Sequence, residues 1–416
     1  MSSPDEPVLR RRLGLFDTVT LGLGSMIGAG IFVAMAPAAA AAGTGMLIGL
    51  AVAAVVAVCN AMSSARLAAL YPQSGGTYVY GRERLNPFWG HTAGWSFIVG
   101  KTASCAAMAL TVGSYVWPAY ANAVAVASVV ALTAVGYAGI QRSATLTRII
   151  VALVLALLAT VVVVVLGFGS ADTSRLALGD DVSAYGVLQA AGLLFFAFAG
   201  YARIATLGEE VRDPARTIPR AVGLALTIAL VVYAVVAVAV LAQLGSAGLG
   251  SAAAPLSEAV QAAGFPELSP VVSVGAAVAA MGALLALLLG VSRTTLAMAR
   301  DHYLPHALAA VHPRHGTPHH AELAVGAVVA VVAALVDVRA AIGFSSFGVL
   351  LYYAIANASA WTLTASLGAR IVPAIGLIGC LTMAFTLPLT SVLAGAAVVL
   401  IGMMAYLTSG RHRHGV

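Results

Sequence analysis

The sequence predicts an all-α membrane protein with twelve transmembrane helices, arranged as two inverted five-helix repeats followed by two further helices. Three observations predict this architecture. Hydrophobic residues make up 61% of the 416 residues and charged residues only 9%, too few charges to cover the surface of a soluble protein. Apolar runs of about 20 residues recur along the whole chain. Two of these runs are interrupted at corresponding positions.

The apolar runs place the predicted helices in order. They cover residues 15–37, 44–65, 91–114, 121–138, 147–168, 186–207, 219–242, 270–297, 321–337, 342–365, 371–388 and 390–407. The first run is far longer than the apolar part of a cleavable signal, and the residues before it are polar. We therefore expect this helix to stay in the mature chain.

Grouping the runs defines the expected domains. The first five form one repeat, residues 15–168, and the next five form the second, residues 186–365. Two accessory helices cover residues 371–407, and the terminal tails are residues 1–14 and 408–416. Because each repeat has an odd number of helices, the second begins on the opposite side of the membrane and the repeats are inverted.

The distribution of arginines predicts that both termini are cytoplasmic. With the N-terminus inside, sixteen of the 21 basic residues face the cytoplasm, whereas only Arg175 and Arg339 fall outside. Short cytoplasmic loops collect positive charge, so we expect a multi-pass protein of the cell membrane. The net charge of +6 then reflects this topology and contact with an anionic lipid bilayer, and no nucleic-acid partner is expected.

The first apolar run contains four glycines near its middle, in the stretch GLGSMIGAGIF at residues 22–32. A second interruption, in the stretch LLFFAFAGYARIATLGEE, surrounds Gly200 in the second repeat. Breaks in a spanning helix are tolerated only where protein or a cavity meets the freed backbone groups. Paired broken helices in inverted repeats indicate a transporter's binding site at the middle of the membrane. The alternative is that the glycines only allow helices to pack closely.

Three motifs, in this order, resemble the amino acid–polyamine–organocation superfamily of permeases. They are GLGSMIGAGIF, EEVRDPARTIPRA at residues 209–221 and SRTTLAMARD at residues 292–301. The chain is similar to bacterial relatives of the cationic amino acid transporters over nearly its whole length. The resemblance implies a LeuT-like fold with broken helices 1 and 6 and alternating access to one central amino acid site.

The resemblance also implies which residues bind the substrate. At the helix 1 break, the carboxylate would meet the backbone of Ser25, Met26, Ile27, Gly28, Ala29 and Gly30. At the helix 6 break, the ammonium would meet carbonyls near Phe198, Ala199 and Gly200. Phe198 and Tyr201 resemble aromatic residues that close over the substrate, with core packing as the alternative.

Lys101, the only lysine of the chain, lies midway along the third run. In the bacterial relatives, a helix 5 lysine near the helix 1 break is thought to replace a sodium ion, and alignment places Val154 there. Lys101 is therefore the proton-coupling candidate, because burial disfavours its ammonium form and makes reversible deprotonation possible. The alternatives are a static bond to carbonyls freed by the helix 1 break, and snorkelling. A charged Lys101 near the substrate would also repel cationic amino acids.

These features predict a secondary active transporter for proton-coupled uptake or exchange of a neutral L-amino acid, and not an enzyme. The expected partners are the amino acid, protons and the bilayer, and the oligomeric state stays open. A sodium-coupled symporter is disfavoured because residues 281–291 of helix 8 offer no hydroxyl ligand. A channel or receptor-like protein without alternating access is a further rival.

No cofactor or metal is expected. Six histidines crowd the loop between the eighth and ninth runs: His302, His306, His312, His315, His319 and His320. No cysteine or carboxylate cluster completes a ligand set for a metal. A solvated loop is therefore favoured over metal binding or pH sensing.

Overall fold

The computed structural model describes residues 13–71, 75–139, 144–179, 182–201, 204 and 211–410. Within these ranges the chain is helical, and the sole β-structure is an isolated bridge between Leu13 and Val211. Among the described residues, eleven stretches of helix are long and apolar enough to cross a membrane. The shorter apolar helix α14 (His319–Leu335) occupies the ninth of the twelve predicted positions. The predicted all-α membrane fold is confirmed.

In the described residues, the first five predicted spans form seven helices, and an eighth helix connects two of them. They are α1 (Leu15–Met26), α2 (Ala29–Val33), α3 (Met35–Ala42), α4 (Met46–Leu70), α5 (Thr77–Arg84), α6 (Pro87–Val116), α7 (Ala121–Tyr137) and α8 (Ala144–Gly167). The start of α6 shows why a helix begins there. The Asn86 side chain accepts a hydrogen bond from the Trp89 N–H, and Pro87 occupies the first turn, where no intrahelical donor is needed.

The second half repeats this order. Its elements are α9 (Ala184–Phe198), the 3₁₀ turn η4 (Ala199–Tyr201), α11 (Pro214–Ser251), α12 (Pro255–Ala262), α13 (Ser269–Arg300), α14 and α15 (Val338–Trp361). The accessory helices α16 (Leu367–Thr386) and α17 (Leu389–Gly410) follow. Short 3₁₀ turns lie at η1 (Gly43–Gly45), η2 (Pro118–Tyr120), η3 (Thr173–Leu176), η5 (Pro266–Leu268) and η6 (His306–Ala309).

The contacts between helices are preserved when the two halves are exchanged. Helix α6 packs on α7 and α15, and its counterpart α13 packs on α14 and α8. Helix α1 packs on α8 and α11, and its counterpart α9 packs on α15 and α4. This reciprocity is that of two repeats related by a two-fold axis, as in inverted-repeat transporters.

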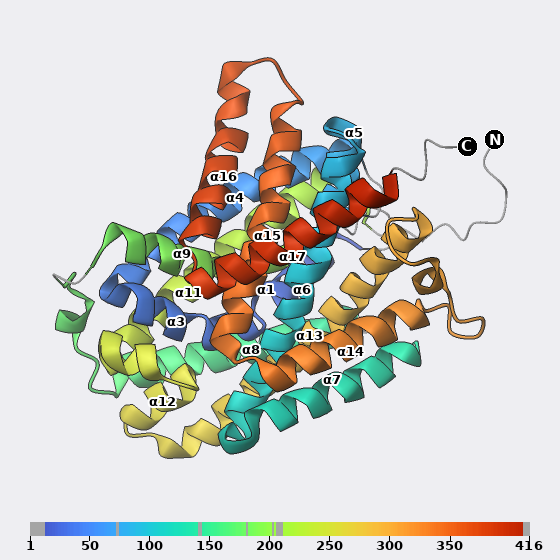
Figure 1. The fold of residues 1–416 in the computed structure, drawn as a ribbon. Helices are drawn as coiled ribbons and strands as arrows, with labels where there is room; N and C mark the ends of the chain where they lie inside the picture. Colours follow the sequence, from blue (N-terminus) through green and yellow to red (C-terminus); the bar gives the residue numbers. More distant parts are fainter. Residues whose placement is uncertain are drawn as a thin grey trace.

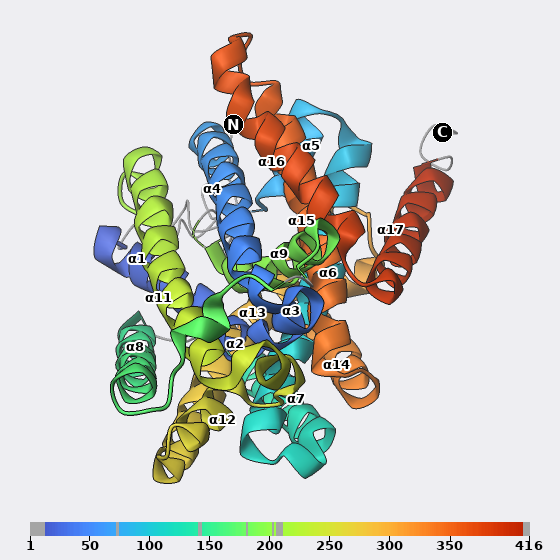
Figure 2. The ribbon, with the colours of Figure 1, turned by 90° about the vertical axis from the view of Figure 1, so that its left-hand side faces the viewer.

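Helix α6 runs through the centre of the molecule, and α8 and α17 lie outside. In the apolar stretch of α6, 83% of the residues are buried, against 33% in α8 and 22% in α17. Figure 2 shows α8 and α17 at opposite edges, and Figure 1 shows α7 and α14 side by side, in agreement with their contacts. The exposed apolar faces of the outer helices are suited to lipid.

Some predictions fall outside the described residues. These are residues 1–12 and 411–416 of the two predicted tails, residues 202, 203 and 205–207 of the sixth predicted helix, and Glu209 and Glu210 at the start of the second motif.

Candidate functional site

The first helix breaks within the glycine-rich stretch. Helix α1 ends at Met26, Ile27 and Gly28 are non-helical, and α2 begins at Ala29. Helix α2 continues into α3, because Ala34 is itself helical and its N–H donates to the Gly30 carbonyl at 2.9 Å. Such a break leaves the last carbonyls of α1 and the first amides of α2 without intrahelical partners. The six residues predicted for the carboxylate, Ser25 to Gly30, span this break.

The sixth helix breaks at the corresponding place. Helix α9 ends at Phe198, and the chain turns through η4, which contains Ala199, Gly200 and Tyr201. The interruption begins where the sequence predicted it. Helix 1 is therefore broken, and helix 6 ends at Phe198 in a turn, which we refer to as the helix 6 break.

The two breaks touch through glycines. A side chain at Gly200 would overlap the backbone of Ser25 and Met26, and a Cβ at Gly30 would lie 2.5 Å from the Cα of Ala197. Each broken helix thus contributes one glycine to its contact with the other. Glycine is required here because the two backbones approach more closely than any Cβ allows.

Gly28 faces a different helix. A Cβ there would lie 2.6 Å from the Cβ of Ala283 in α13. The φ of Gly28 is −102°, so this glycine provides space for a close approach and does not provide a left-handed backbone. The glycines of this stretch therefore lie at a helix break and also allow close helix packing, as the alternative proposed.

Tyr233 of α11 connects the two breaks. Its Oη lies 2.6 Å from the Met26 carbonyl oxygen and 3.0 Å from the Ala197 carbonyl oxygen, so its single proton is shared between two acceptors. Its buried ring meets Phe198 edge-on, with centroids 5.1 Å apart. The sequence analysis missed this residue. A lone tyrosine in the aliphatic run at 219–242 was the available signal, because its hydroxyl needs a partner in the membrane.

Lys101 of α6 reaches the helix 6 break. Its Nζ donates to the Ala199 carbonyl oxygen at 3.1 Å, and its side chain is buried. The expectation that a static bond would involve carbonyls of the helix 1 break is wrong, because the acceptor belongs to helix 6. Among the described residues, no carboxylate forms an ion pair with Lys101. The C-terminal end of α9 carries partial negative charge, which favours a cation at this point.

Aromatic side chains enclose the helix 6 break. The ring of Tyr201 stacks on Tyr353 of α15, with centroids 5.1 Å apart and planes 28° apart. Phe195 meets Tyr353 edge-on at 5.8 Å. Phe198 and Tyr201 are both fully buried. A cavity lined in part by Gly30 and Tyr233 measures only about 10 Å³, the volume of about one water, so it does not hold an amino acid.

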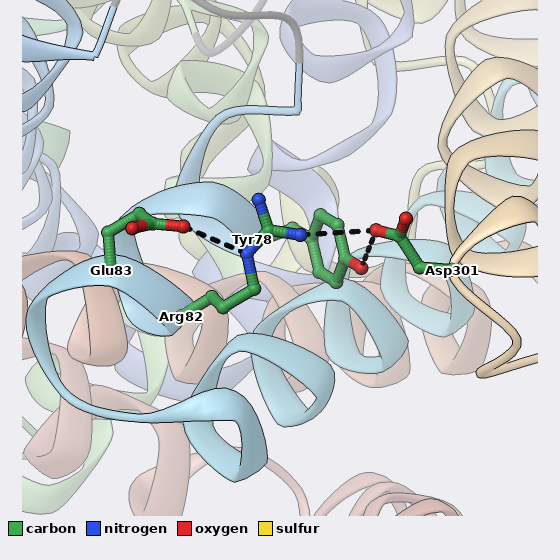
Figure 3. A network of polar contacts seen from close by, with 4 residues as sticks. All are labelled: Tyr78, Arg82, Glu83 and Asp301. Atoms are coloured by element: carbon green, nitrogen blue, oxygen red, sulfur yellow. Dashed lines mark hydrogen bonds and ion pairs between the residues drawn. The ribbon is translucent and has the colours of Figure 1, made fainter.

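A polar network ties α5 to the end of α13. The Tyr78 hydroxyl donates to Oδ2 of Asp301, and Arg82 Nη1 lies 3.2 Å from the same oxygen (Figure 3). Glu83 accepts from Arg82 Nε at 3.0 Å. Burial, and then the Asp301 carboxylate, raise the pKa of Tyr78, so that its hydroxyl stays a donor. Asp301, the last residue of the third motif, thereby links the two repeats.

Main-chain groups of the histidine loop hold the ring of His312. Nδ1 of His312 accepts the N–H groups of Arg314 at 3.2 Å and His315 at 3.3 Å. Burial, followed by the neighbouring His315, His319 and Arg314, lowers the pKa of His312. In the part of the chain that the structure covers, no group of three His, Cys, Asp or Glu side chains is placed to hold a metal ion.

Nearly the whole chain matches one known family of membrane proteins. The family described as Amino acid permease matches residues 17–412. The chain belongs to the amino acid permease family. This permease is 71% identical over 405 residues to an uncharacterized transporter of Mycobacterium tuberculosis, with 97% of the chain and 92% of the relative covered.

More distant relatives carry specific names. This permease is 26% identical over 445 residues to the branched-chain amino acid permease of Bacillus subtilis, covering 98% of the chain and 94% of the relative. It is 29% identical over 376 residues to human cationic amino acid transporter 4, covering 84% of the chain and 59% of the relative. The predicted superfamily is confirmed. The permease is a multi-pass membrane protein, and its relatives are transporters.

Proposed function

We propose that this permease is a secondary active transporter that carries a neutral L-amino acid by proton-coupled uptake or exchange. One observation carries the proposal: the two broken helices meet backbone to backbone, and the Lys101 Nζ donates to the Ala199 carbonyl at their junction. An α-amino acid has an ammonium and a carboxylate two bonds apart on one carbon. It needs a carbonyl end and an amide end side by side, and the junction supplies both.

Each end of the substrate has proposed partners. The amides at the start of the helical run at 29–42 favour an anion by their orientation and by the helix dipole. We assign the carboxylate to this end, at Ser25, Met26, Ile27, Gly28, Ala29 and Gly30. We assign the ammonium to the carbonyls of Phe198, Ala199 and Gly200, with the rings of Phe198 and Tyr201 over the bound amino acid.

The charge of Lys101 supports a neutral substrate. Two unit charges 4 Å apart repel by about 4 kcal/mol at an effective dielectric constant of about 20. A cationic side chain bound beside an unpaired, buried Lys101 would therefore lose at least about tenfold in affinity. The branched-chain permease is a relative named for neutral substrates, whereas the cationic transporters support the opposite choice. The substrate panel must include both classes.

The narrow cavity beside the breaks supports alternating access. A cavity of about 10 Å³ does not hold an amino acid, so we expect the broken helices to move relative to the surrounding helices when the substrate binds. The proposal places both tails in the cytoplasm and the permease in the cell membrane. It makes Lys101 the proton-coupling residue, because its ammonium is buried without a carboxylate partner in the described structure.

Counterflow in liposomes tests the function. Purified permease is reconstituted with each of the twenty amino acids inside, and entry of the labelled amino acid is followed under a pH gradient, a sodium gradient or neither. The panel includes methylthioribose, because a Bacillus subtilis relative 26% identical to the chain is named as its transporter. Protein-free liposomes give the background.

We expect neutral L-amino acids to show counterflow, and a pH gradient to drive their accumulation. Replacing sodium with choline should change nothing. Flux without counterflow would indicate a channel, and loss of uptake in choline would indicate a sodium-coupled symporter. Preference for arginine or lysine would contradict the neutral substrate.

A further inference from the structure

Lys101 occupies the position that the proposed function assigns to the substrate's amino group. Its Nζ lies 3.1 Å from the Ala199 carbonyl oxygen at the helix 6 break. The side-chain ammonium and the α-ammonium of an amino acid are the same chemical group and donate hydrogen bonds to the same kind of acceptor. We propose that Lys101 is an internal stand-in for the substrate ammonium: it fills the amino subsite of the empty permease and must withdraw before an amino acid binds.

Electrostatics makes the occupancy exclusive. Ala199 is buried at the C-terminal end of α9, where orphan carbonyls favour a cation and an unpaired carbonyl is costly. Two ammonium groups on one carbonyl would lie within a few ångströms of each other and repel by several kcal/mol. The carbonyl therefore holds either Lys101 or the substrate.

The surrounding packing fixes the helix that carries Lys101. The preceding residue, Gly100, meets Gly348 and Val349 of α15, where an added Cβ would lie 3.0 Å from the Val349 nitrogen. The backbones of α6 and α15 are thus in direct contact beside Lys101. Exchange of the two ammonium groups takes place by movement of the lysine side chain or of the helix 6 break, because α6 has no space to slide toward α15.

The stand-in has a consequence for the transport cycle. A carrier whose closed state needs a bound substrate can only exchange one substrate for another. Lys101 supplies the missing ammonium when the site is empty, so the breaks close without substrate. The unloaded permease can then change the side of the membrane to which its site opens. This inference rests on the proposed function and adds that Lys101 permits net transport in place of obligatory exchange.

A binding cycle tests the competition. The probes are L-leucine and 4-methylpentanoate, which has the same carbon chain and carboxylate and no ammonium. Their dissociation constants are measured with the full-length wild type, Lys101→Met and the control Ser104→Ala. Ser104 is buried on the same helix and bonds to Ser345 and to the Gly100 carbonyl of its own helix. Size-exclusion profiles check that each variant is folded.

We expect Lys101→Met to raise the ratio of the two constants, 4-methylpentanoate over leucine, at least fivefold, and Ser104→Ala to leave it within twofold. Taking the ratio cancels any effect of the lost charge on the carboxylate. In liposomes, Lys101→Met should keep leucine exchange and lose at least fivefold in net efflux into leucine-free buffer. An unchanged or lower ratio, or unchanged net efflux, overturns this inference alone. Failure of all three proteins to bind any of the twenty amino acids overturns the proposed function, and this inference with it.

Discussion

Replacing Tyr233 with phenylalanine removes a single hydroxyl that serves both broken helices. The hydroxyl lies 2.6 Å from the carbonyl oxygen of Met26 and 3.0 Å from that of Ala197. The ring is buried against Phe198, so phenylalanine fills the same volume. The substitution therefore removes only the hydrogen bonding of the hydroxyl, and with it the contact that holds the two breaks in their relative positions.

The size of the effect follows from the two contacts. Hydrogen bonds between membrane helices contribute about 0.6 kcal/mol on average and up to about 1.7 kcal/mol. Because two carbonyls share this one donor, we expect Tyr233→Phe to lower the free energy of unfolding by about 1–2 kcal/mol. In thermal unfolding this corresponds to a drop in Tm of about 2–4 °C. Because the lost donor sits on the breaks to which we assign the substrate, we also expect leucine affinity to fall at least fivefold.

A matched control separates stability from binding. Tyr115 of α6 is equally buried, and its hydroxyl donates to the carbonyl of Phe32 at 2.8 Å, beyond the helix 1 break. Thermal unfolding in detergent and leucine counterflow are measured for Tyr233→Phe and Tyr115→Phe. Both variants should lose stability, and only Tyr233→Phe should lose binding. Equal losses of binding, or none in either variant, would refute the reasoning that Tyr233 registers the two breaks.

Two further predictions concern Gly28 and the histidine loop. Gly28→Ala should abolish leucine binding, since its Cβ would lie 2.6 Å from that of Ala283; Gly28→Ala with Ala283→Gly should restore binding, and failure of the rescue would place the defect elsewhere. The lowered pKa of His312 means that the unfolded chain takes up its proton first, so stability should fall as pH drops below about 6.5. His312→Asn keeps an acceptor without titrating, and its Tm should change less between pH 7 and pH 5 than that of the wild type; an identical pH profile would contradict this.

The membrane explains why so much of the fold was predictable from the sequence. A spanning helix must be long, apolar and internally hydrogen-bonded, so each of the twelve runs gave a helix near its expected position. The two breaks were equally visible, because Gly28 and Gly200 interrupt runs that otherwise read as continuous helices. These features depend on local sequence alone.

The partners of the breaks depend on tertiary structure and were not predictable. Nothing in the run around Tyr233 indicates that its hydroxyl reaches two other helices. One alternative considered for Lys101 was a bond to helix 1, and the bond lies on Ala199 of helix 6, because the two breaks are in contact and sequence spacing cannot distinguish them. Ala283, which leaves no room for a side chain at Gly28, is one of many alanines in its helix.

The contact between the two breaks has an evolutionary consequence. The atoms at this junction that would meet the ends of an amino acid belong to the main chain, at residues such as Ala199 and Gly28. Main-chain carbonyls and amides are unchanged by most codon substitutions, provided that small residues keep the backbones close. Side chains around the junction are therefore free to diverge and to alter which solute is accepted. Relatives only 26% identical to this chain can in this way differ in the side chains around the junction while the proposed main-chain contacts to an amino acid are kept.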